Sequence, residues 1–119
     1  MNYSYLPAIA GRLRPAGAAA AAAAANFPTA ALAIAQRLLE STGVPFEAMR
    51  PLVDRIAANA FELGPSASLT GPIARGDVET IDAQIDAVRV AAPDLAHAFE
   101  AMVSATADVA TARKIEGGA

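Results

Sequence analysis

The sequence predicts an all-α fold, a compact bundle of about four to six helices. Alanine dominates the apolar residues, which make up 55% of the 119 positions, and alanine has the highest helix propensity. Apolar residues recur at spacings of three and four, whereas no segment alternates with the period of a strand. Because alanine buries little surface, we expect close helix packing and modest stability unless a partner covers further surface.

The domain organisation follows from where this period begins and ends. Residues 1–15 show no helical period and contain proline and glycine, which predicts an N-terminal arm or a linker remnant. The helical domain is expected over residues 16–114, followed by a frayed tail over residues 115–119. Its first helix should span residues 16–41, with a kink or a division into two helices at Pro28, which lacks a backbone donor.

The middle of the chain is expected to contain a second helix and a long loop. Gly43 suits the left-handed cap that ends the first helix. The second helix is expected to begin at Pro45, because proline is tolerated in a first turn, and to bend at Pro51. Residues 63–76 combine glycines, prolines and serines, which predicts a loop.

Two amphipathic helices complete the prediction. Asp77 is a favourable N-cap for a third helix over residues 78–90, whose apolar residues repeat at three and four positions. The pattern breaks at Pro93, and a fourth helix is expected over residues 94–113.

Composition excludes several classes of function. The net charge is −3 and no basic cluster exists, so we expect no nucleic-acid partner. The chain has no cysteine and a single histidine, His97, which predicts no metal site and no catalytic triad and suits a cytoplasmic protein. The apolar run over residues 16–35 could be a membrane span or a cleaved export segment. It is mostly alanine, interrupted by Asn26 and Pro28, so we expect no membrane partner.

The most specific segment is Leu69–Asp77, which reads LTGPIARGD. It resembles the LTGP-x-x-RGD loop in the C-terminal helical domain, of unknown function, of a family of uncharacterised Rossmann-like NAD(P)-binding proteins. That family is similar in architecture to pyrroline-5-carboxylate reductase and 6-phosphogluconate dehydrogenase. Ala25–Phe27 and Gly43–Val44 resemble further family elements in the same order. The resemblance covers about residues 15–105 and implies a bundle like the C-terminal domain of 6-phosphogluconate dehydrogenase.

The chain departs from this family in two respects. Gly17 and Ala18 replace a usual aromatic-His pair, and Gln84 stands where a histidine is common. No G-x-G-x-x-G fingerprint occurs, so the dinucleotide-binding domain is expected to be missing from this chain. The chain should therefore hold no cofactor and should not be catalytic alone. NAD or NADP is implied only through a Rossmann domain that is separate or lies upstream.

Six residues are substrate-side candidates: Asn26, Asn59, Thr70, Gly71, Arg75 and Asp77. Thr70 offers a hydroxyl, and Gly71 permits close backbone approach. Arg75 could clamp a carboxylate or phosphate with two hydrogen bonds. Asp77 could equally cap the third helix while it pairs with Arg75, which is a purely architectural role.

The two asparagines carry alternatives of their own. The resemblance implies that Asn26, on the long helix, faces a substrate near the nicotinamide. Alternatively, its amide bonds the backbone groups that Pro28 frees. Asn59, near the end of the second helix, could be a C-terminal cap instead of a site residue.

Two functional hypotheses follow. In the first, the chain is the helical dimerisation and substrate-side domain of a Rossmann-type NAD(P)-linked oxidoreductase-like protein, and it forms a homodimer. In the second, it is a stand-alone helical interaction or structural protein with no catalytic role, which the departures at the histidine positions favour. The substrate and the choice between NAD and NADP are not encoded in this chain.

Overall fold

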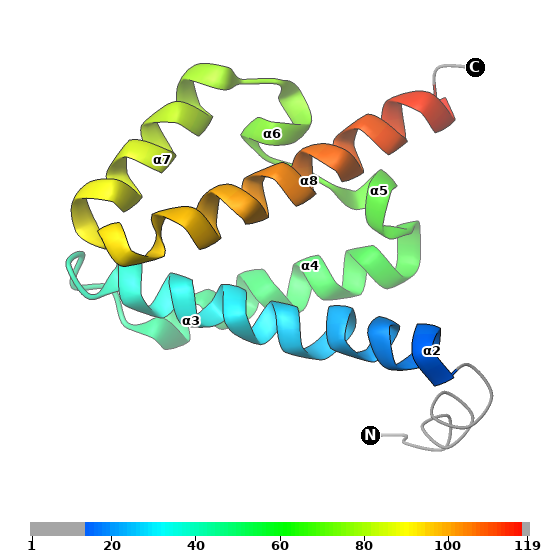
Figure 1. Ribbon diagram of the computed structural model, residues 1–119, viewed down its shortest axis with the longest axis horizontal. Helices are drawn as coiled ribbons and strands as arrows, with labels where there is room; N and C mark the ends of the chain where they lie inside the picture. Colours follow the sequence, from blue (N-terminus) through cyan, green and yellow to red (C-terminus); the bar gives the residue numbers. More distant parts are fainter. Residues whose placement is uncertain (1–13, 118–119) are drawn as a thin grey trace. The chain divides into compact units, whose positions relative to one another are not determined.

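The computed structural model describes residues 14–117 and contains helices but no strand within that range (Figure 1), which confirms the all-α prediction. The chain divides into two compact units, Met1–Ile34 and Ala35–Ala119. The expected arm, residues 1–15, lies outside the described residues except for its last two. Those two already belong to α2, which begins at Arg14.

The first unit is built on helical backbone that continues through Pro28. It contains α2 (Arg14–Ala21), a π-helical turn η1 (Ala22–Asn26) and the start of α3 (Phe27–Leu39). The Phe27 N–H bonds the Ala22 carbonyl, five residues earlier, which widens the turn directly before the proline. The expected division at Pro28 therefore takes the form of a π-turn, which accommodates the proline ring without ending the helix.

One helical stretch, Pro15–Leu39, is long and apolar enough to cross a membrane when judged by length and composition. It has 25 residues and a mean hydropathy of 1.5, and 6% of the window is buried. Core helices of soluble proteins and signal sequences satisfy the same criteria. The absence of a membrane partner therefore stays a prediction.

The second unit begins with the last turn of α3 and a reversal at Gly43, whose φ of 77° confirms its predicted left-handed position. A 3₁₀ turn, η2 (Phe46–Met49), then leads into α4 (Arg50–Leu63). The expectation that a helix begins at Pro45 with a bend at Pro51 was wrong. Pro45 is extended, with ψ of 147°, and Pro51 lies in the first turn of α4, where its missing donor costs nothing.

The expected loop over residues 63–76 contains two one-turn helices, α5 (Pro65–Ser68) and α6 (Pro72–Arg75), so this prediction was also wrong. Each helix begins with a proline that follows a glycine of positive φ, 89° at Gly64 and 95° at Gly71. The glycine turns the chain and the fixed φ of the proline starts the next turn of helix. Residues that usually interrupt helices here initiate them.

Two longer helices close the second unit. Asp77 caps α7 (Val78–Ala91) as predicted, because its Oδ1 accepts the Thr80 N–H at 3.2 Å. A 3₁₀ turn, η3 (Pro93–Leu95), leads into α8 (Ala96–Gly117), which runs past its expected end and includes the first residues of the expected tail. The remaining tail residues lie outside the described range. In Figure 1, α7 lies along the first half of α8, and α5 and α6 lie toward its second half.

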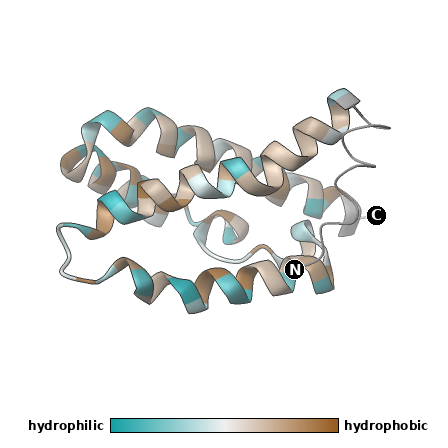
Figure 2. Ribbon diagram, turned by 90° about the horizontal axis from the view of Figure 1, so that it is seen from below, coloured by the Kyte–Doolittle hydropathy of each residue, from teal (hydrophilic) through white to brown (hydrophobic). Residues whose placement is uncertain are grey.

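The second unit buries few bulky side chains. Among residues 14–117 the buried hydrophobic residues are Val88, Ala92 and Ala110. Large apolar residues recur at exposed positions in both units, and Figure 2 shows hydrophobic and hydrophilic residues interspersed along the helices. The exposed large apolar residues are Phe27, Val44, Leu52, Ile56, Phe61, Leu63, Val78, Val90, Val109 and Ile115. Each unit therefore exposes apolar surface that soluble monomeric proteins ordinarily bury.

Polar contacts join the elements where the core is thin. Arg37, in the last turn of α3, donates from both terminal nitrogens to the two carboxylate oxygens of Asp94, each at 3.0 Å. The hydrogen bond to Arg37 is the main cause that lowers the Asp94 pKa, and the same bond raises the pKa of Arg37. Arg89 similarly pairs with Glu100 and so connects α7 with α8. Asp94 and Glu100 thus serve as contacts between elements.

We expect Gly71→Ala to lower the free energy of unfolding by about 1–3 kcal/mol, because alanine rarely adopts that backbone conformation. A Cβ at Gly71 or at Gly76 would meet nothing within 4 Å, so the effect comes from the backbone alone. Urea denaturation measures it. Gly76→Asn is the control, because its φ of 69° lies in the region that asparagine tolerates. Equal stability of the two variants would contradict this account.

Candidate functional site

The loop Leu69–Asp77 is held from the far end of the chain by Arg113. Its Nη1 donates to the Leu69 carbonyl at 2.8 Å, and its Nη2 donates to the Ala74 carbonyl at 3.4 Å. The half-buried guanidinium thus bonds both ends of the segment that contains the Gly71 reversal. Analysis of the sequence missed this role of Arg113. Arg113 continues the face of α8 that carries Met102, Thr106 and Val109, and this spacing was the available signal.

Thr70 and Arg75 are the two polar side chains that the loop presents to solvent. Thr70 is exposed, and its hydroxyl has no hydrogen-bond partner within the described part of the chain. The Arg75 side chain is 64% exposed, and its Nη2 lies 3.7 Å from Asp77 Oδ2. A guanidinium this open can receive a carboxylate or a phosphate, and the Thr70 hydroxyl can donate to the same class of ligand.

Asp77 is committed to helix capping. Its Oδ2 accepts the Thr80 hydroxyl at 2.7 Å, and its Oδ1 accepts the Thr80 backbone N–H. The hydroxyl bond is the main cause that lowers the Asp77 pKa, the backbone bond comes next, and Arg75 contributes less. The architectural role considered for this residue is therefore observed, and it leaves Arg75 only loosely paired.

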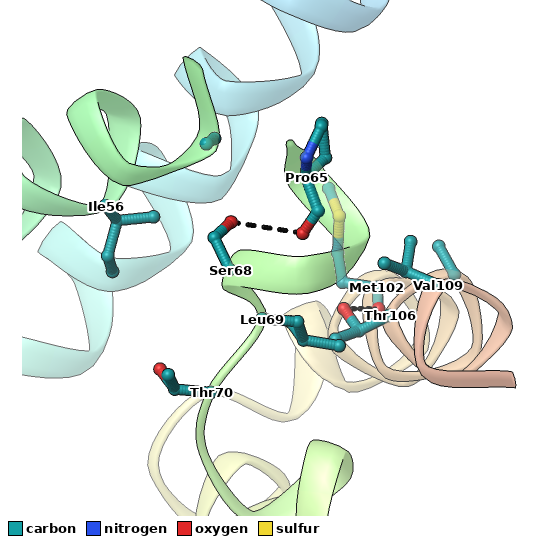
Figure 3. A pocket seen from close by; sticks show the side chains of 10 residues that line it. Ile56, Pro65, Ser68, Leu69, Thr70, Met102, Thr106 and Val109 are labelled. Atoms are coloured by element: carbon teal, nitrogen blue, oxygen red, sulfur yellow. Dashed lines mark hydrogen bonds between the residues drawn. The ribbon is translucent and has the colours of Figure 1, made fainter. Parts of the chain in front are cut away.

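An apolar groove of about 410 Å³ lies beside the loop, between α4, α5 and α8 (Figure 3). It is lined by Ile56, Ala60, Pro65, Ser68, Leu69, Thr70, Met102, Ala105, Thr106 and Val109. Two of its hydroxyls are bonded internally, Ser68 to the Pro65 carbonyl and Thr106 to the Met102 carbonyl. Figure 3 shows Leu69 directed toward α8 and Thr70 turned away from it. The groove therefore suits an apolar group better than a charged one.

The remaining candidates lie elsewhere. Asn59 is half-buried inside α4, and the cap of that helix is Gly64, whose N–H bonds the Ala60 carbonyl. The alternative that Asn59 caps the helix was thus wrong. Asn26 belongs to the first unit and is exposed at the end of the π-turn, where the Thr29 hydroxyl bonds the Ala25 carbonyl at 2.8 Å. The Asn26 amide makes no hydrogen bond within the described residues, so the alternative that it bonds the backbone groups freed by Pro28 is not observed.

The described residues offer no built metal centre. Within residues 14–117, no group of three or more His, Cys, Asp or Glu side chains could hold an ion. His97 is exposed on α8. The chemistry that the loop Leu69–Asp77 and its surroundings offer is accordingly an open guanidinium at Arg75, a free hydroxyl at Thr70 and an apolar groove.

Comparison with known proteins gives one family. A family model described as a domain of unknown function (DUF2520) matches residues 7–106. The chain belongs to this family. No curated protein and no solved structure matches the chain.

The DUF2520 match extends over both units and over all six candidate residues. The match ends within α8, seven residues before Arg113. The loop that Arg113 holds thus lies inside the matched region, whereas the arginine lies beyond it. The side chain that positions this loop is therefore not part of the matched family pattern.

We expect Thr80→Val to raise the Asp77 pKa toward its ordinary value of 3.8, because the variant removes the hydroxyl donor that lowers it most. NMR titration of the Asp77 carboxyl carbon measures the change. Because the folded-state pKa is lowered, the Asp77 interaction stabilises the fold above the ordinary pKa. That contribution is lost as the pH falls through the lowered value. The pKa of Asp94, which Arg37 lowers, serves as the control and should not move.

Arg113→Gln should lower the free energy of unfolding by about 1–3 kcal/mol, because two carbonyls lose a charged donor. It should also speed amide hydrogen exchange at Gly76 and its neighbours in the loop. Lys114→Gln makes the same charge change on the exposed adjacent residue and should leave both measurements near the wild type. If the two variants unfold at the same urea concentration, the Arg113 hydrogen bonds to Leu69 and Ala74 do not stabilise the fold.

Proposed function

We propose that the chain is the helical dimerisation and substrate-side domain of a Rossmann-type NAD(P)-linked oxidoreductase-like protein. The observation that carries this proposal is the exposed apolar surface of the second unit. Phe61 is 92% exposed and Leu63 is 63% exposed, while the buried hydrophobic residues of the described chain are small or of medium size. Surface of this kind is typical of a domain that is completed by a partner.

The loop Leu69–Asp77 supports the substrate-side part. Arg113 holds its backbone at two carbonyls, so Thr70 and Arg75 project from a positioned segment. A carboxylate or phosphate of a substrate would bind the Arg75 guanidinium with two hydrogen bonds, and Thr70 would orient it. By resemblance, Asn26 on the long helix would face a substrate.

A dinucleotide does not fit the described residues. Residues 14–117 form no strand–turn–helix unit, and the short helices α5 and α6 each begin with a proline, which has no N–H to offer a pyrophosphate. In this proposal NAD or NADP is held by a separate or upstream Rossmann domain. The residues of this chain bind and orient the substrate and take no part in holding the cofactor.

We also propose that the Pro15–Leu39 helix packs against protein, in a cytoplasmic setting, and does not enter a membrane. Most of its residues are alanine, which is only marginally apolar. Asn26 and Pro28 lie near its middle, where a membrane-spanning helix would be in hydrocarbon. Small alanine side chains instead allow another helix to approach closely.

The second candidate function is a stand-alone helical interaction protein with no catalytic role. Asp77 favours it, because this carboxylate is fully used in capping α7 and also lies near Arg75. The resemblance of the loop to the family loop would then reflect its architecture. The absence of charged side chains from the groove is also compatible with a surface that binds protein.

The deciding experiment is to sequence the DNA upstream of the Met1 codon and to co-express any Rossmann domain found there with this chain. A strand, a G-x-G-x-x-G turn and a helix encoded there would support the proposal. The complex would then be assayed for NAD(P)-linked turnover with pyrroline-5-carboxylate and 6-phosphogluconate as carboxylate-containing probes. If the DNA encodes no such unit, the proposal of an upstream Rossmann domain fails and the interaction protein is favoured.

In the co-expressed complex, we expect Arg75→Ala to lower kcat/KM for an active probe by about 100-fold, because a charge-assisted two-bond contact is lost. Arg50→Ala is the control. Like Arg75, Arg50 is exposed and lies near an aspartate, with its Nε 3.8 Å from Asp54 Oδ2, but it belongs to α4 and not to the loop. Equal activity of the two variants would assign Arg75 to architecture and support the interaction protein.

A further inference from the structure

Helix α4 carries an apolar stripe of which at least half stays exposed. Leu52, Ile56 and Leu63 are spaced by four and seven residues, which places them on one face of the helix. They are 54%, 53% and 63% exposed. Ile56 also lines the groove, so the stripe continues into it (Figure 3). The α4 face is thus one side of a larger apolar surface.

Two opposite charges lie along one edge of this stripe. Arg55 and Glu62 are seven residues apart, two turns of helix, so both lie on the same flank about 10 Å apart along the axis. That separation is too long for a direct ion pair. Neither side chain has an ion pair or a hydrogen bond within the described residues. Arg50 and Asp54, by contrast, pair with each other at 3.8 Å.

We propose that a second copy of this chain docks antiparallel along α4, an inference that rests on the dimerisation part of the proposed function. A two-fold axis near the middle of the stripe places Leu52 opposite Leu63 of the other copy, and the reverse. The same rotation keeps the flank that carries Arg55 and Glu62 on one side of the interface in both copies. Arg55 of each copy therefore faces Glu62 of the other. The stripe is thereby self-complementary in both its apolar residues and its charges.

The charges decide the orientation and favour a second copy as the occupant. A parallel pair would place the flank with Arg55 and Glu62 on opposite sides of the interface in the two copies, so these charges would stay unpaired. The antiparallel pair converts four unpaired charges into two ion pairs at the rim of the interface. Helix α4 has 14 residues and a length of about 21 Å, which is small for a stable interface. We therefore expect a dimer with a dissociation constant of about micromolar magnitude.

Sedimentation velocity on the whole chain, from low to high micromolar concentration, tests this arrangement. The wild type should dimerise, and Arg55→Glu or Glu62→Arg alone should raise the dissociation constant by about tenfold or more, because two attractions become repulsions. The double variant should recover affinity near the wild type. Arg50→Glu makes the same charge change on the far side of the stripe and should have no comparable effect. Circular dichroism verifies that each variant stays helical.

Each result has a defined meaning. Recovery in the double variant supports the antiparallel α4 pair. A dimer that is insensitive to the single reversals, or single defects that the double variant does not repair, overturns it while leaving dimerisation standing. A wild type that is monomeric throughout overturns both. None of these outcomes affects the upstream DNA result, so the failure of this inference and the failure of the oxidoreductase proposal remain distinguishable.

Discussion

Alanine lets helices approach closely but removes little apolar surface from water, and this limit governs the molecule. The residues that the described chain buries, Val88, Ala92 and Ala110, could not anchor a bundle by bulk alone. Many of the larger apolar side chains are consequently exposed on the surface. The exposed stripe on α4, the open groove and the proposal of a partner all follow from a composition that favours helix more strongly than it favours a core.

Arginine contacts supply part of the ordering that a larger core would provide. Arg113 fastens a loop to α8 through two backbone carbonyls, and Arg37 joins the end of α3 to η3 with two bonds to Asp94. A guanidinium suits both tasks because its planar group presents several donors in a fixed geometry. Its long stem can also cross apolar surface before reaching its partner. Lysine would offer the charge without that geometry.

The parts of the fold that depend on local chemistry were predictable from the sequence, and the parts that depend on distant contacts were not. Helical spacing and the Asp77 cap located α7 nearly to the residue. The glycines and prolines of residues 63–76 predicted a loop and so hid α5 and α6, because the same residues can break or begin a helix. For the site, family resemblance singled out the loop but not its clamp. Arg113 lies 44 residues from Leu69, and no local rule connects them.

The groove and the loop are physically connected through one stretch of α8. Val109 lines the groove, and Arg113, one turn further along the helix, holds the carbonyls of Leu69 and Ala74. Leu69 itself takes part in both, since its side chain lines the groove while its carbonyl accepts from the clamp. In the proposed function, a partner that packs into the groove would contact Leu69, whose carbonyl the Arg113 guanidinium holds. Association and the geometry of the loop Leu69–Asp77 would in this way be linked by packing, without any need for a moving domain.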